Sequence, residues 1–175
     1  MKTKEIYFLE WNGPYDSFED MRMKEGIDTC SIYLITGKKK FARNSCCREI
    51  KYVGITERDV TKRIEDKDHL EKRMNFKDVH FWAARFNKEG YKNYRCHAEL
   101  VEWCLIRFLA TVGAPIVNIK KTRTNPKKNV TVISRWGKKF NDEHRLNKSS
   151  ELSWLSDIIV YEDNSFWFSE KLVEV

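Results

Sequence analysis

The clearest structural element that the sequence predicts is a helix over residues 98–112. At roughly 100° per residue, seven apolar side chains of this segment fall on one stripe: Leu100, Val101, Cys104, Leu105, Phe108, Leu109 and Val112. Gly113 and Pro115 come directly after it, and both residue types end helices. This stripe is the face that we expect the fold to bury.

Short β-prone segments lie on both sides of this helix. They cover residues 6–11, 30–36, 50–55, 79–86 and 130–136, followed by a hairpin of 158–161 with 165–168 around Asp163-Asn164. The first strand is expected to stop at the turn cluster Asn12-Gly13-Pro14. The second is apolar at nearly every position, which predicts a central place in the sheet.

Two further helices are predicted from their capping residues. Ser17 stands three residues before Asp20 and would cap a helix of one or two turns. Thr56 stands three residues before Asp59 and would begin another. The second helix would carry Arg63 at the edge of its apolar face, where a guanidinium reaches a cleft while its stem packs. Strands and helices together predict an α/β (α+β) fold.

Composition limits the class of protein. With 175 residues, 41% of them hydrophobic, and no apolar run long enough to cross a bilayer, the chain predicts one globular domain with a sizeable core and no membrane partner. Residues 1–5 show no apolar signal segment. Five cysteines without paired spacing argue against a secreted disulfide scaffold. We therefore expect a cytoplasmic protein.

The positive charge is concentrated in one part of the chain. The net charge is +7, but residues 38–128 hold 23 Lys and Arg against 11 Asp and Glu, a balance of +12. The two flanks hold 10 basic and 15 acidic residues, a balance of −5. A polyanion is the natural partner of such a segment, because each neutralised phosphate releases counterions. The alternative is a lysine-rich solvated surface.

Four short motifs follow one another along the chain, the first just before this basic stretch and the other three inside it. They are Ser31-Ile32-Tyr33, Tyr52-Val53-Gly54, Glu102 followed by Leu105-Ile106, and Pro115-Ile116-Val117-Asn118, with Arg63 between the second and the third. In this order they resemble the GIY-YIG endonuclease family over roughly half of the chain. The resemblance implies a small central mixed or antiparallel β-sheet flanked by helices, one divalent metal and the cleavage of DNA.

The same resemblance implies a division of the chain. We expect a single domain over residues 1–175, in which residues 29–119 form the nuclease core. Residues 1–28 would be an N-terminal extension, and residues 120–175 a basic loop followed by a C-terminal β-hairpin extension.

Each catalytic residue also receives a role from the resemblance. Tyr33 would be the general base, Tyr52 would line the same cleft, and Arg63 would hold the scissile phosphate. Glu102 would bind the metal, Mg²⁺ or alternatively Mn²⁺, and Asn118 would brace the site. Phosphodiester hydrolysis needs an activated water, charge stabilisation on the phosphoryl oxygens and a stabilised leaving oxygen, and this set can supply all three.

The long helix offers a second carboxylate, Glu99. Projected around the helix axis, Glu102 lies about 105° from the centre of the apolar stripe and Glu99 about 165° from it. A cleft residue belongs at the border of the buried face, so the projection favours Glu102 as the metal ligand.

The chain departs from the family pattern at two positions. Ser31 stands where the family usually has glycine, which removes no catalytic group. Members often carry a histidine four residues after the arginine, and here that position is Lys67, with His69 two residues further on. Either Lys67 or His69 could fill the role, and the sequence leaves both open.

Candidate DNA contacts lie in two basic segments and at Gly54 of the second motif. The connection between Tyr33 and Tyr52 is 18 residues long and is predicted to form a basic finger on the DNA backbone, with a merely solvated loop as the alternative. Its cations are Lys38, Lys39, Lys40, Arg43 and Arg48. The second segment follows Asn118 and carries Lys120, Lys121 and Arg123.

The resemblance and the size of the chain lead to a functional expectation. A single domain without an appended zinc finger or helix-turn-helix must recognise DNA with its own loops, which favours a restriction or phage-defence endonuclease. Double-stranded DNA is the expected partner, and a symmetric site would allow a homodimer. The alternatives are a non-catalytic nucleic-acid-binding protein that keeps the fold, and a nuclease that acts on RNA.

Overall fold

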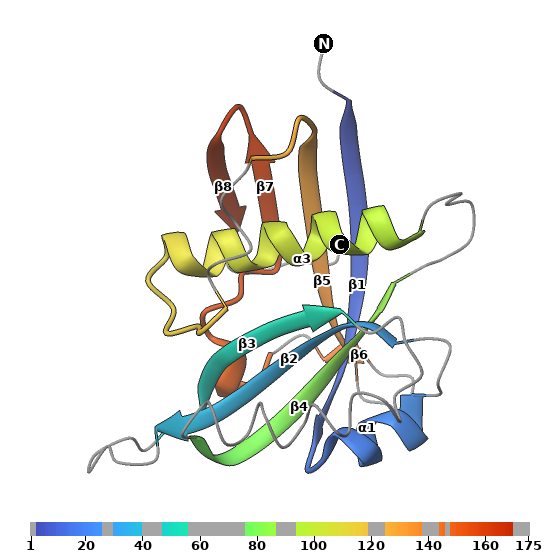
Figure 1. Ribbon diagram of the computed structural model, residues 1–175, viewed down its shortest axis with the longest axis vertical. Coiled ribbons are helices and arrows are strands. Elements are labelled where there is room, and N and C mark those ends of the chain that lie inside the picture. Colours follow the sequence, from blue (N-terminus) through green and yellow to red (C-terminus); the bar gives the residue numbers. More distant parts are fainter. Residues whose placement is uncertain are drawn as a thin grey trace.

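The predicted strands assemble into one curled sheet, with a long helix inside the curl (Figure 1). The computed structural model describes residues 3–25, 30–39, 47–55, 76–86, 94–118, 125–137, 144–145 and 148–169. Within these residues the fold is mixed α+β, with the strand order β3-β2-β4-β1-β5-β7-β8 and β6 paired to β5. No described helix is both long and apolar enough to cross a membrane.

Every strand and helix predicted within the described residues is present, and the structure adds a short strand at 144–145 and a 3-10 helix at 150–152 that were not predicted. In chain order the elements are β1 (Lys4–Tyr15), α1 (Phe18–Glu25), β2 (Cys30–Lys39), β3 (Glu49–Ile55), β4 (Phe76–Phe86), α3 (Tyr94–Thr111), β5 (Asn129–Gly137), β6 (His144–Arg145), the 3-10 helix η2 (Ser150–Leu152), β7 (Ile158–Glu162) and β8 (Ser165–Ser169). The helix expected from Thr56 lies outside the described residues.

Strand β1 departs from its prediction in length and in place. It continues through Asn12-Gly13-Pro14 to Tyr15 with a shift of register, so this cluster interrupts the strand without ending it. Gly13 has φ 138°, and a Cβ there would lie 2.9 Å from the Trp82 ring, so glycine lets β4 pass closely. Because β1 pairs antiparallel with β4 and parallel with β5, residues expected to form an N-terminal extension lie in the middle of the sheet.

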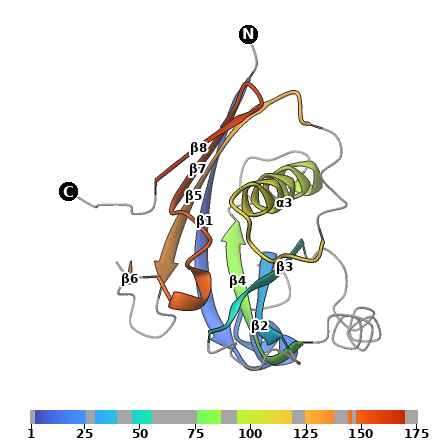
Figure 2. The ribbon, with the colours of Figure 1, turned by 90° about the vertical axis from the view of Figure 1, so that its left-hand side faces the viewer.

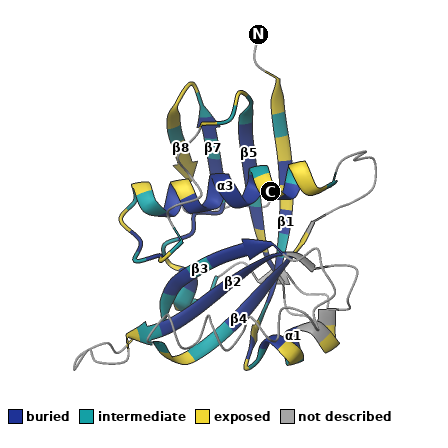
Figure 3. Ribbon diagram, viewed as in Figure 1, coloured by how far each residue is buried: buried dark blue, intermediate teal, exposed yellow. Residues whose placement is uncertain are grey.

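Helix α3 packs into the concave side of the sheet (Figure 2). Its buried side chains form the main core with residues of β1, β2, β3, β5 and β7. The predicted stripe is buried at Val101, Cys104, Leu105, Phe108 and Leu109, and Ala98, Trp103 and Ile106 are buried as well. More than one side of the helix is covered because the sheet curls around it (Figure 3).

A second, smaller core lies on the opposite face of β2 and β4. Phe18 and Met21 of α1 pack there against Tyr33, Ile35 and other residues. Side chains alternate between the two faces of a strand, so β2 is buried on both, as its continuous apolar pattern predicted. The N–H of Asp20 donates to Ser17 Oγ at 2.9 Å, which confirms the predicted cap of α1.

The C-terminal hairpin forms as predicted. Asp163 and Asn164 have φ values of 49° and 67°, and two residues with positive φ between paired strands make a type I′ turn. The hydroxyl of Tyr161 donates to Asn164 Oδ1 at 2.9 Å. This turn sets the register of β7 against β8.

Candidate active site

The hairpin of β2 and β3 brings together the two predicted tyrosines. Tyr33 lies opposite Gly54, and Ile35 lies opposite Tyr52, which puts both tyrosine side chains on the same face. Their rings are stacked, with centroids 5.9 Å apart and an interplanar angle of 23°. Phe18 of α1 packs edge-on against the Tyr33 ring at 5.6 Å. Tyr33 is buried, and Tyr52 is half-buried.

Gly54 was predicted to contact nucleic acid. The structure shows that it also has a packing role, because the Tyr33 ring lies against it. The Tyr33 ring lies directly over it, so that a Cβ on residue 54 would be 2.5 Å from Tyr33 Cζ and 2.6 Å from its hydroxyl oxygen. The space above Gly54 is thus filled by Tyr33. Glycine is needed here to seat the tyrosine ring, because any side chain would displace it.

Asn118 attaches the segment after α3 to the outer edge of β3. Its Nδ2 donates to the carbonyl of Val53, and the N–H of Val53 donates to its Oδ1 at 3.5 Å. The N–H of Val117 donates to the carbonyl of Lys51 at 2.9 Å. Val53 stands between Tyr52 and Gly54, so the side chain of Asn118 braces the backbone that carries the tyrosine site.

The two carboxylates of α3 have different surroundings. The Glu102 side chain is buried, with 4% of the residue exposed. The Glu99 side chain is 48% exposed and accepts a hydrogen bond from Arg95 Nε at 2.8 Å. In the part of the chain that the structure describes, no three His, Cys, Asp or Glu residues form a cluster that could hold a metal. A metal at Glu102 would therefore depend on few protein ligands from the described residues.

The tyrosine pair and α3 lie on opposite faces of the β2–β3 hairpin. Tyr33 packs with α1, whereas Val53 and the buried face of α3 belong to the other core. Strand β3 ends the described sheet on this side. A side chain from α3 therefore reaches the tyrosine face only by passing the edge of β3, where Asn118 is attached.

Several predicted site residues fall in segments that the structure does not describe. They are Arg63, Lys67, His69, Lys40, Arg43, Lys120, Lys121 and Arg123. The phosphate clamp, the choice between lysine and histidine, and the second basic segment therefore stay predictions.

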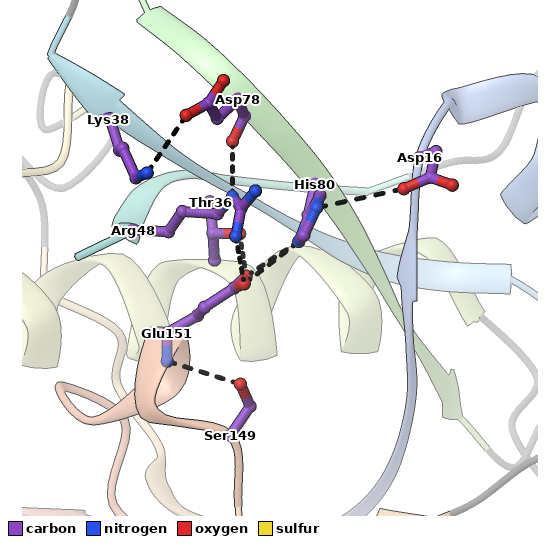
Figure 4. Close-up of polar contacts among 8 residues, drawn as sticks. All are labelled: Asp16, Thr36, Lys38, Arg48, Asp78, His80, Ser149 and Glu151. Atoms are coloured by element: carbon purple, nitrogen blue, oxygen red, sulfur yellow. Dashed lines mark hydrogen bonds and ion pairs between the residues drawn. The ribbon is translucent and has the colours of Figure 1, made fainter. Parts of the chain in front are cut away.

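Two cations of the predicted basic finger make contacts inside the protein (Figure 4). Lys38 Nζ lies 3.1 Å from Asp78 Oδ2, and the hydrogen bond from this ammonium lowers the pKa of the Asp78 carboxyl. Arg48 Nε donates to the carbonyl of Asp78 at 2.9 Å, and its Nη1 lies 3.4 Å from Glu151 Oε1. Lys39 is exposed. Lys38 and Arg48 would have to exchange these partners for phosphates, so the structure favours a structural role for both.

Sequence reasoning missed the polar cluster around Glu151. Its carboxylate accepts from Thr36 Oγ1 at 2.7 Å and lies 3.0 Å from His80 Nδ1, while His80 Nε2 is 3.9 Å from Asp16 (Figure 4). Thr36 and His80 are register partners on β2 and β4. The cluster joins η2 to the sheet across 71 to 115 residues of chain, a separation over which local patterns carry no signal.

A buried lysine beside Tyr52 was also missed. The register of β3 leaves Lys51 without an opposite residue, between Ile50 and Tyr52, which is a β-bulge. Lys51 is 1% exposed, and its Nζ bonds Glu49 Oε2 at 2.8 Å. This hydrogen bond lowers the pKa of the Glu49 carboxyl.

We expect Glu49→Gln to destabilise the protein by about 1–2 kcal/mol at neutral pH, because a buried ammonium loses its charged partner. A lowered folded-state pKa means that this stabilisation is complete above the ordinary value of 4.5 and is lost as the pH falls through the lowered value. Urea unfolding of both proteins at neutral and acid pH measures the difference, which should vanish in acid. A difference that persisted there would contradict the ion pair as its cause.

The chain was compared with models of protein families, with curated proteins and with solved structures. None of them matched. The likeness to the GIY-YIG family therefore rests on the sequence motifs quoted above.

Proposed function

We propose that this protein is a divalent-metal-dependent endonuclease that hydrolyses DNA in the manner of the GIY-YIG family. The observation that carries the proposal is the seat of Tyr33 on Gly54, with Tyr52 stacked beside it. Three residues of the first two motifs, Tyr33, Tyr52 and Gly54, thus meet in one place, and the close approach of the Tyr33 ring requires glycine at position 54.

In this proposal the tyrosines handle the proton of the attacking water. The two phenol rings stack on each other, which limits how each ring and its hydroxyl can turn. Orientation of a proton acceptor is worth a large part of a hydrolytic barrier. Arg63 would bind the scissile phosphate, because a guanidinium matches two phosphate oxygens at once.

Glu102 would hold the metal. A carboxylate oxygen is the ligand type that Mg²⁺ takes, commonly through one or two carboxylates with the remaining positions left to water and substrate phosphate, so the donor fits the ion. When bound, Mg²⁺ would stabilise charge on the phosphoryl oxygens. Asn118 would keep the end of α3 fastened to the strand that carries Tyr52.

Removing the hydroxyl of each tyrosine in turn should identify the one that acts as the general base. Tyr33→Phe and Tyr52→Phe keep the stacked rings, so we expect little change in folding and a fall of about 10²–10⁴-fold in cleavage for the general base. Single-turnover cleavage and duplex binding of both variants give the comparison. Wild-type rates in both variants would contradict tyrosine catalysis.

The function itself is tested by incubating the purified protein with supercoiled plasmid and Mg²⁺ or Mn²⁺, and sequencing the ends. Discrete ends at a recurring sequence would support a restriction or phage-defence enzyme. Binding without cleavage in either metal would point to the non-catalytic alternative. Cleavage of RNA but not of DNA would show that the protein is a nuclease that acts on RNA.

A further inference from the structure

Strand β8 forms one end of the described sheet, opposite the end that carries the tyrosine site (Figures 1 and 3). It has two exposed aromatic residues, Trp167 at 68% and Phe168 at 53%. An open edge strand usually carries charge or proline, which discourage pairing with another chain. The five residues of β8, Ser165-Phe166-Trp167-Phe168-Ser169, include neither.

The sequence of β8 reads the same in both directions around Trp167. If a second copy approached in antiparallel orientation with a two-fold axis at Trp167, serine would lie opposite serine, and Phe166 would lie opposite Phe168. An isologous contact requires such self-complementarity. Because β8 has no charged residue, this pairing brings no like charges together.

The backbone of β8 is in the correct phase for this pairing. In a two-residue hairpin the pair beside the turn exchanges both hydrogen bonds, and every second pair does so along the ladder. The pair beside the turn is Glu162 and Ser165, so Trp167 also directs its N–H and C=O toward β7. Phe166 and Phe168 then direct theirs to the side of β8 that has no partner strand among the described residues. They become hydrogen-bonded partners in the two-fold register, and the two Trp167 residues form the close, non-hydrogen-bonded pair.

The side chains agree with the backbone. Phe166 and Phe168 contact Phe108 of α3 with centroid distances of 5.8 and 5.3 Å, so these rings lie on the helix side of the sheet. Trp167 points to the other side, beside its register partner Val160. Pairing would cover the exposed part of Phe168 with the second copy's Phe166, and would stack the two Trp167 rings as a cross-strand aromatic pair.

We propose that β8 is a self-association strand, which joins two copies of this chain into one continuous sheet about a two-fold axis at Trp167. This inference does not depend on the proposed nuclease activity, and its test contains no DNA. A five-residue strand pair buries less than the roughly 1,200 Å² of a stable interface, so we expect a dimer that dissociates on dilution.

Sedimentation equilibrium from low micromolar to near-millimolar protein tests the proposal. The wild-type mass should rise from 21.0 kDa toward twice that value. Trp167→Lys should stay monomeric, because two ammonium groups would meet at the axis. Phe8→Lys is the matched control, since Phe8 is 56% exposed on β1, away from the β8 edge, and it should dimerise like wild type. A monomeric wild type, or a dimeric Trp167→Lys, would overturn the proposal.

Cross-linking tests the register separately. In a background with serine at Cys30, Cys46, Cys47 and Cys96, Trp167→Cys should form a disulfide-linked dimer under mild oxidation, because Cα atoms of a non-hydrogen-bonded pair lie about 4.5 Å apart. Ser165→Cys should not, since its partner is Ser169. Equal cross-linking of the two variants would exclude the two-fold axis at Trp167. Thermal unfolding of each variant checks that the fold is retained.

Discussion

Replacing Glu102 with glutamine is expected to lower DNA cleavage by at least about 10³-fold while duplex binding stays close to wild type. The amide has nearly the same shape but lacks the charge that a divalent metal requires, and the proposed site uses Glu102 for the metal and not for DNA. Cleavage is measured at saturating protein with Mg²⁺, and binding by fluorescence anisotropy without metal. Thermal unfolding shows whether the buried position tolerates the change.

Glu99→Gln is the control for this experiment, because it changes the same group on the same helix. Glu99 is exposed and bonds Arg95, so its loss should alter stability by only a few tenths of a kcal/mol and leave cleavage unchanged. If Glu99→Gln lost activity and Glu102→Gln kept it, the assignment of the metal ligand would be wrong.

Gly54→Ala is expected to damage the site without removing any functional group. The new Cβ would lie within 2.7 Å of three Tyr33 atoms, and the ring has little room to move because Phe18 and Tyr52 pack against it. Such overpacking costs about 1–3 kcal/mol. Displacing the hydroxyl by an ångström can lower the cleavage rate on the order of 10²-fold. Urea unfolding and single-turnover cleavage measure the two effects.

Gly37→Ala on β2 is the matched control. The nearest atom to a Cβ on residue 37 would be 3.4 Å away, so this variant should lose little cleavage activity. A double-mutant cycle shows the cause. In a Tyr33→Ala background, Gly54→Ala should no longer destabilise the protein, because the clash is gone. An equal penalty in both backgrounds would place the role of Gly54 in the backbone and not under the tyrosine ring.

Local patterns predicted the elements whose contacts are local. The apolar stripe at residues 98–112 identified α3, and Asp163-Asn164 identified the turn of the β7–β8 hairpin. The resemblance implied that Tyr33 and Tyr52 would line one cleft, and the register of the β2–β3 hairpin puts both side chains on the same face. Helical projection put Glu102 at the border of the apolar stripe and Glu99 on the solvent side; Glu99 is exposed as predicted, whereas Glu102 is buried because the sheet curls around α3.

Contacts between distant segments were not predictable in this way. Strand β1 pairs in parallel with β5, more than 120 residues later, and nothing in either segment identifies the other. The same is true of Glu151, which meets Thr36 across 115 residues. Patterns of alternation show that a strand has a buried face, but they do not name the strand that pairs with it.

The sequence alone predicted the type of the longer described elements and the residues that resemble a nuclease motif, but not β6, η2 or the full length of β1. Periodicity and turn chemistry act within a few residues, which is why they could be read directly. Tertiary structure alone decided that Gly54 makes room for Tyr33, that Asn118 binds the edge of β3, and that Lys38 and Arg48 have partners inside the protein. These contacts depend on which atoms the fold brings within a few ångströms of one another. The number of residues between two positions in the sequence does not give that distance.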